Sequence, residues 1–177
     1  MGAVKLKLDF SKVNPKQQQA LQDTHKYIGY GGARGGGKSW FVRIKAILLA
    51  CSFTGIKILI VRQSYPELMN NHIREMRSIL HGVAKYVDKE KIFYFANGST
   101  MQFMYCQHDA DLNRFQGTEY DVIFIDEATH LTEYQIKTII LCLRGANEFP
   151  KRVYFTTNPG GASHHYFKRI FIDKDYM

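Results

Sequence analysis

The segment Gly32-Ala-Arg-Gly-Gly-Gly-Lys-Ser39 constrains the fold more than any other part of the sequence. Its glycines allow the backbone to turn several N–H groups inward, around an anion. The residues before it, Tyr27 to Tyr30, predict a short strand, and Lys38 to Ala50 predict a helix that begins at the loop. A helix N-terminus adds the positive end of its dipole to such a site. The pattern G-x-x-x-x-G-K-S in this context indicates a loop that binds the phosphates of a nucleotide.

The residue types of the loop predict a division of roles. Lys38 can reach the β- and γ-phosphates, and the hydroxyl of Ser39 can ligate Mg²⁺. The opposing interpretation is a flexible glycine loop that carries an incidental lysine. The loop residues predicted to bind the nucleotide, with ATP as the expected ligand, are Gly32, Ala33, Arg34, Gly35, Gly36, Gly37, Lys38 and Ser39.

A second acidic site follows an apolar strand. Val122 to Ile125 reads as a buried strand, and two carboxylates, Asp126 and Glu127, come directly after it. In phosphate-loop enzymes an Asp at this position helps to hold Mg²⁺, and an adjacent Glu can polarise the attacking water. A solvated strand end is the alternative for the acidic pair taken alone. Together with the phosphate loop, the pair predicts Asp126 as a magnesium and nucleotide residue and Glu127 as the catalytic base.

Two arginines are candidates for stabilising the charge that develops on the γ-phosphate during transfer. Arg34 lies inside the phosphate loop, where a charge without a partner is costly unless it faces phosphate or an acid. Arg114 lies in the segment before the acidic strand. A solvated loop position is the alternative for each of them.

Polar residues near the first and last strands extend the predicted site. Thr156, Thr157 and Asn158 end a strand at Val153 to Thr156 and could sense the γ-phosphate or a water, although a turn before Pro159 explains them as well. Near the N-terminus, the Gln17 amide could pair with both edges of adenine, which would favour ATP over GTP. A helix surface is the other interpretation of Gln17, because two further glutamines follow it.

Strand-like and helix-like segments alternate along the chain, which predicts an α/β fold with a parallel sheet flanked by helices. Further strands are expected at Ile56 to Val61, and further helices from Ser64 to about Leu80 and from Thr132 to about Arg144. An antiparallel β-hairpin is expected near residues 91–105, because Asn97-Gly98 separates two β-rich runs. Ligands bind at the carboxyl ends of the strands in such sheets, and all of the predicted site residues except Gln17 and Arg114 lie at such ends.

The composition favours a polyanionic partner. The formal net charge is +8 over 177 residues, which suits nucleic acid first, although a basic surface that serves only solubility has the same effect on the count. The three cysteines have no CxxC spacing and suit a reducing cytoplasm. No stretch approaches the ~20 apolar residues of a membrane helix, so we expect no membrane association.

The order of these motifs resembles that of the ATPase domain of phage terminase large subunits. The resemblance covers about residues 12 to 160, and its most specific element is the arginine within the phosphate loop. One departure is Gln116, where relatives often carry an arginine before the glycine. The segments that carry the resemblance are Asn14-Pro-Lys-Gln17, Gly31-Gly-Ala-Arg-Gly-Gly-Gly-Lys-Ser39, Phe124-Ile-Asp-Glu-Ala128 and Phe155-Thr-Thr-Asn-Pro159.

The resemblance implies a P-loop NTPase of the RecA-like, additional-strand catalytic-glutamate class that moves double-stranded DNA into a procapsid. It further implies a homo-oligomeric ring, with the portal protein and the small terminase subunit as partners, in the host cytoplasm at the procapsid portal. Arg34 would act within its own subunit, Arg114 would reach a neighbouring subunit, and Thr156 to Asn158 would couple hydrolysis to movement. We expect residues 1–177 to form a single ATPase domain, without the nuclease domain of the family.

Two other functions remain open from the sequence. The first is a helicase-like, DNA-dependent ATPase, which would need a second RecA-like domain with its own arginine motif. The second is a nucleotide-gated DNA-binding or assembly module that does not turn ATP over. Glu127 argues against the second, because a pure switch needs no base to polarise water.

Overall fold

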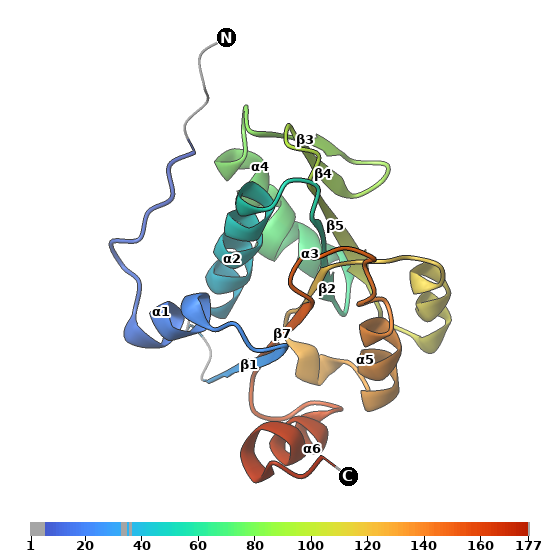
Figure 1. Ribbon diagram of the computed structural model, residues 1–177. Coiled ribbons are helices and arrows are strands. Elements are labelled where there is room, and N and C mark those ends of the chain that lie inside the picture. Colours follow the sequence, from blue (N-terminus) through green and yellow to red (C-terminus); the bar gives the residue numbers. More distant parts are fainter. Residues whose placement is uncertain (1–5, 33–34, 36, 177) are drawn as a thin grey trace.

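The computed structural model describes residues 6–32, 35 and 37–176, and within them a seven-stranded sheet carries helices on both faces (Figure 1). The strand order across the sheet is β1-β7-β6-β2-β5-β4-β3. The strands are β1 (Tyr27–Gly31), β2 (Lys57–Arg62), β3 (Ala84–Val87), β4 (Ile92–Phe95), β5 (Thr100–Tyr105), β6 (Val122–Ile125) and β7 (Arg152–Thr157). The α-helices are α1 (Pro15–Gln22), α2 (Lys38–Ser52), α3 (Tyr65–Leu68), α4 (Arg74–Ile79), α5 (Glu133–Ile140) and α6 (His164–Phe167).

Five neighbouring strands, from β1 to β5 in the strand order, run parallel. Their carboxyl ends therefore meet at one edge of the sheet, which is where such folds bind ligands. Register brings specific residues together there, because Val61 pairs with Ile125 and Tyr30 pairs with Thr156. The predicted α/β fold with a parallel sheet flanked by helices is confirmed.

The core is divided by the sheet into two layers. On one face α2 and the helical segment from α3 to α4 pack on Ile58, Ile60 and Phe124. On the other face α5, α6 and the 3-10 helix η2 (Asp109–Phe115) pack on Ile123 and Phe155. All four residues of β6 are buried, as its unbroken apolar run predicts for a central strand that is covered on both sides.

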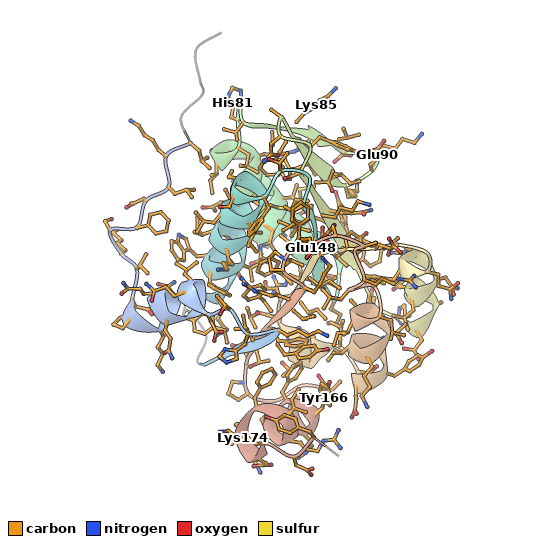
Figure 2. The ribbon with its side chains drawn as sticks, in the orientation of Figure 1. His81, Lys85, Glu90, Glu148, Tyr166 and Lys174 are labelled. Carbon is orange, nitrogen blue, oxygen red and sulfur yellow. The ribbon has the colours of Figure 1, made fainter. Side chains whose placement is uncertain are left out.

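The predicted hairpin is present as β4 and β5, which pair antiparallel on either side of Asn97-Gly98. The strand β3 adds to β4 antiparallel and was not predicted from the sequence. None of the four residues of β3 is fully buried, and its sequence lacks the clear alternation of apolar and polar residues that would have marked a strand. The one charged side chain of β3, Lys85, is exposed, and Figure 2 shows Lys85 and Glu90, in the turn after β3, projecting outward from this end of the molecule.

Two predicted helices differ from the structure. The helix from Ser64 contains a π-helix, η1 (Met69–Ile73), between α3 and α4. The prediction that the helix from Thr132 reaches Arg144 is wrong, because α5 ends at Ile140. The chain leaves the helix there to form a β-bridge between Leu143 and Tyr120, and the Tyr120 N–H donates to the Cys142 carbonyl. Among the described residues, no helix combines the length and the apolar character needed to cross a membrane.

Candidate nucleotide-binding site

A cavity of about 710 Å³ opens at the carboxyl edge of the parallel strands. Its lining joins the end of the phosphate loop to the acidic strand end and to the segment after β7. Four of the predicted residues that meet here are Lys38, Ser39, Glu127 and Asn158. The cavity is large enough for a nucleotide-sized ligand. The remaining lining residues are Gly35, Gly37, Trp40, Arg43, Thr129, His130, Pro159, Gly160 and Gly161.

The phosphate loop joins α2 through Gly37, which has φ of 70°. A Cβ atom at this position would lie 2.1 Å from Nε2 of Gln17, so only glycine fits both the backbone conformation and the space. The Gln17 amide donates to the Gly37 carbonyl at 3.3 Å, and its oxygen accepts the N–H of Asn14 in a capping box for α1. Gln17 thus lies against the phosphate loop, and its pairing with adenine stays a prediction.

Lys38 begins α2 and is mostly buried, with its Nζ donating to the Gly32 carbonyl at 3.1 Å. Burial lowers the pKa of Lys38, and the carboxylates of Asp126 and Glu127 offset this only in part. A lysine whose charge is poorly solvated gains most from an anion that enters the cavity. This environment suits the predicted contact with β- and γ-phosphates.

Asp126 is fully buried and is not among the residues that line the cavity. The hydroxyl of Ser39 donates to its Oδ2 at 3.2 Å, and the hydroxyl of Thr156 donates to its Oδ1 at 2.5 Å. Burial by itself raises the pKa of Asp126, but the interactions with His72, Arg62 and Thr156 outweigh burial and hold the pKa well below its usual range. The side chain is therefore a carboxylate fixed beside Ser39.

Glu127 occupies the left-handed backbone region, with φ of 51°, which is uncommon for a residue other than glycine. Such strain concentrates at functional sites, where the surroundings hold it. Here the N–H of Glu127 donates to the Thr156 hydroxyl at 2.9 Å, and Asn158 Nδ2 lies 3.4 Å from Oε1. The conformation turns the Glu127 side chain toward the cavity, next to the buried Asp126.

The predicted coupling residues lie in different environments. Thr156 is buried and connects Asp126 to the backbone of Glu127, whereas Asn158 lines the cavity. Thr157 is partly buried beside the start of the phosphate loop, because a Cβ atom on Gly31 would lie 3.1 Å from its hydroxyl. Thr156 and Asn158 thus contact the acidic pair directly, and Thr157 does not contact it through any hydrogen bond between described residues.

Of the two predicted arginines, Arg114 lies within the described residues, and the structure places it outside the cavity lining. Arg114 is half-exposed on η2, forms an ion pair with Asp111 and stacks its guanidinium 4.0 Å from the ring centre of Tyr105. It is absent from the residues that line the cavity. An assignment of Arg114 to the site of its own subunit therefore has no geometric support. Arg34, Ala33 and Gly36 lie outside the described residues.

Sequence reasoning missed two buried residues that contact the acidic pair, an arginine and a histidine. Arg62 ends β2 and lies 2.9 Å from Oε2 of Glu127 and 3.4 Å from Oδ2 of Asp126. His72 lies in η1, with Nε2 at 2.7 Å from Asp126 Oδ2. A charge that ends a buried strand at the ligand edge was a usable signal for Arg62. No comparable signal exists for His72, because a histidine within a helical apolar stripe is usually core.

Two further residues of the cavity wall were also missed. His130 Nδ1 lies 3.4 Å from Oε2 of Glu127. Arg43 stands one helical turn after Ser39 on α2, and its guanidinium donates to the Asn71 carbonyl in η1. Burial lowers the pKa of Arg43, and its Nε has no hydrogen-bond partner among the described residues. Together with Lys38, Arg43 makes the wall formed by α2 cationic.

The donor atoms fit a magnesium–nucleotide complex. Mg²⁺ prefers hard oxygen ligands, and the Ser39 hydroxyl and the Asp126 carboxylate supply them side by side. Asn158 Oδ1 is buried beside the cavity without a hydrogen-bond partner among the described residues. Such an orphaned acceptor is usually satisfied by a ligand or a water. The site therefore offers cations for phosphate and oxygen donors for a metal ion.

The family model for the phage terminase large subunit matches residues 24–177. The chain belongs to this family. No curated protein matches the sequence significantly. Among solved structures, the large terminase of a thermophilic bacteriophage in complex with ADP has a TM-score of 0.72 and 18% identity, and the match covers 91% of this chain and 42% of that one. The same terminase has also been solved with ATP-gamma-S, with a TM-score of 0.70.

Two further solved structures share the fold. The HK97 bacteriophage large terminase has a TM-score of 0.68 and 13% identity, over 93% of this chain and 38% of that one. The N-terminal domain of the DNA packaging ATPase from bacteriophage phi29 has a TM-score of 0.60 and 17% identity, over 92% and 89%. The chain thus spans less than half of the length of the thermophilic-phage and HK97 terminases. The RecA-like architecture expected from the sequence is confirmed by these structural matches.

Proposed function

We propose that this chain is the ATP-hydrolysing motor domain of a terminase large subunit, and that it drives double-stranded DNA into a procapsid. The observation that carries the proposal is that Glu127 lines the same cavity as Lys38 and Ser39, directly after the buried Asp126. Family membership supports it. The thermophilic-phage relative binds ADP and ATP-gamma-S, and the phi29 relative is a DNA packaging ATPase.

The residues divide the work of phosphoryl transfer. Lys38 and the loop backbone bind the phosphates, and Ser39 and Asp126 hold Mg²⁺, which neutralises charge on the β- and γ-oxygens when it is bound. Glu127 orients the attacking water and accepts its proton. Thr156 contacts both acidic residues and lies one residue before the end of β7, so a change in their positions reaches the segment with Asn158. That path is the proposed connection between hydrolysis and movement.

In the proposed assembly, copies of the protein form a ring at the portal in the host cytoplasm, with the small terminase subunit as a further partner. The exposure of Arg114 and its distance from the cavity of its own subunit are consistent with a role toward a neighbouring subunit. Arg34 then acts within its own subunit. The net charge of +8 suits the phosphate backbone of DNA.

The proposal is tested by measuring ATP turnover as a function of protein concentration, with and without double-stranded DNA. Turnover per subunit that rises with concentration and with DNA supports a ring in which neighbours complete the site. In that case Arg114→Ala removes the rise, and mixing with intact subunits restores it. Turnover that is strictly proportional to concentration, lost in Arg34→Ala and retained in Arg114→Ala, contradicts the ring and leaves a self-sufficient ATPase. No DNA stimulation at any concentration contradicts the translocase.

A further inference from the structure

The buried histidine of η1 has a role in the site that the sequence motifs do not include. His72 is fully buried, and the π-helix that carries it interrupts an otherwise α-helical segment between α3 and α4. A π-helical turn inserts one extra residue, changes the direction of the side chains around it, and is frequent at functional sites. In this protein the turn faces the Asp126 end of β6.

The chemistry of the pair determines which group donates. Donors surround the Asp126 carboxylate, because Ser39, Thr156 and Arg62 all contact it, so it acts as an acceptor. The 2.7 Å contact with its Oδ2 therefore requires a hydrogen on His72 Nε2. The other ring nitrogen, Nδ1, is buried without a hydrogen-bond partner among the described residues. The contact with Asp126 is thus the polar interaction that fixes the orientation of this imidazole.

The same carboxylate oxygen faces the predicted magnesium residue. Ser39 Oγ lies 3.2 Å from Asp126 Oδ2, while Thr156 contacts the opposite oxygen, Oδ1. A carboxylate rotates about its terminal bond unless its hydrogen bonds fix it. His72 and Thr156 contact it from two sides, and Arg62 Nε lies 3.4 Å from Oδ2, so these contacts hold Oδ2 toward the hydroxyl of Ser39. Histidine in this place sets the direction of an oxygen atom as well as its charge.

We propose that His72 is a positioning residue for magnesium-dependent ATP binding, and that it acts by holding Asp126 Oδ2 beside Ser39. The inference rests on the proposed ATP-binding function. Groups that orient metal-binding side chains are commonly worth a factor of roughly 10 to 100 in metal affinity. A histidine that only fills the core would contribute to folding and leave the magnesium requirement unchanged.

Two amides separate these roles. The amide nitrogen of glutamine stands as many bonds from Cβ as Nε2 of histidine does, whereas that of asparagine stands where Nδ1 does. His72→Gln therefore keeps a donor within reach of Asp126, and His72→Asn withdraws it. Both variants bury a neutral amide, so their general cost to folding is similar. Met76→Leu, a volume-conserving change in the buried face of α4, controls for repacking of the same helical segment.

The experiment titrates Mg²⁺ against the binding of a fluorescent ATP analogue to the whole chain. For His72→Asn we expect the half-saturating Mg²⁺ concentration to rise roughly 10- to 100-fold. His72→Gln and Met76→Leu should stay within about threefold of the parent, and analogue binding in excess chelator should be the same in all four proteins. Should His72→Asn fold poorly, His72→Leu fills the space without a donor and carries the same expectation.

Each outcome decides the role of His72. A magnesium dependence of His72→Asn and His72→Leu equal to that of the parent overturns the inference, and so does an equal shift in His72→Gln and His72→Asn. Failure of the proposed function looks different, because the parent would then bind the analogue no better than Lys38→Ala does at any Mg²⁺ concentration. That result would overturn both the function and the positioning role.

Discussion

Charged residues gather in two regions of the sheet, and the regions differ in how far water reaches them. At the carboxyl ends of β2 and β6, the side chains of Arg62 and Asp126 are 4% and 0% exposed. Around the turn between β3 and β4, at the far end of the strand order, the side chains of Arg77, from α4, and of Asp88 are 48% and 61% exposed. Both regions pair opposite charges, but only in the first are the charged side chains buried away from water. A buried charge depends on its partners, whereas an exposed one depends mainly on water.

We expect the largest effect on stability at Arg62, in the buried region. Arg62→Met leaves two carboxylates without their shared cation in the buried region, and removing one partner of such a pair costs about 3–5 kcal/mol. We expect the free energy of unfolding in urea to fall by this amount. Arg77→Met on α4, which removes the exposed partner of Asp88, is the matched control, and its loss should be about 1 kcal/mol or less. Equal losses in the two variants would show that burial does not distinguish the regions.

The phosphate loop gives the next largest effect, on ligand affinity rather than on stability. Lys38→Ala removes a charge-assisted contact to phosphate worth about 3 kcal/mol, so the Kd for ATP should rise about 100-fold. Isothermal titration calorimetry measures this directly. Lys91→Ala, in the turn between β3 and β4, removes an equal charge from a residue that does not line the cavity, so it should leave the Kd for ATP unchanged. A Kd that rises equally in both would indicate that only net charge matters.

Acid should weaken the buried region first. The pKa of Asp126 is lowered from 3.8 in the folded protein, so its carboxylate contributes stability above pH 3.8, which is lost as the pH falls toward the folded pKa. In this window the unfolded chain binds one proton more at this residue, which gives a slope of about 1.4 kcal/mol per pH unit. Asp126→Asn should remove that part of the slope, whereas Asp88→Asn should keep it. An unchanged slope in Asp126→Asn would contradict the buried ionic pair.

The smallest effect is expected around the turn between β3 and β4. Asp88 contacts both Arg77 and Lys91, and the side chains of Asp88 and Arg77 are 61% and 48% exposed, while that of Lys91 is 30% exposed. Asp88→Asn should therefore change the free energy of unfolding at pH 7 by less than about 1 kcal/mol, with a further decrease in high salt. A larger loss would mean that this exposed cluster behaves like the buried one.

The sequence predicted the parts of the site that depend on local pattern. The loop from Gly32 to Ser39 and the strand that ends at Asp126 each carry their signal within a few residues, and the parallel register then brings them together. The hairpin at Asn97-Gly98 was predicted for the same reason, since its turn chemistry is local.

The residues that escaped prediction depend on packing between distant segments. His72 reaches Asp126 only because a π-helix turns it inward, and no pattern in the sequence marks that turn. The end of α5 at Ile140 depends on a bridge from Leu143 to Tyr120 that helical periodicity does not reveal. Arg114 lies on the surface against Tyr105, and its role toward a neighbouring subunit stays a prediction. Tertiary contacts decide the cases of His72 and α5.

The central claim is that Glu127 is the base of an ATPase site that Lys38 and Asp126 complete, and the most direct test compares Glu127→Gln with the parent in two assays on the same samples. The substitution keeps the shape of the side chain but removes the group that accepts the proton. We predict an unchanged Kd for Mg–ATP and a turnover lower by a factor of about 10³. Equal turnover in the two proteins would remove Glu127 from the role of base and contradict the account.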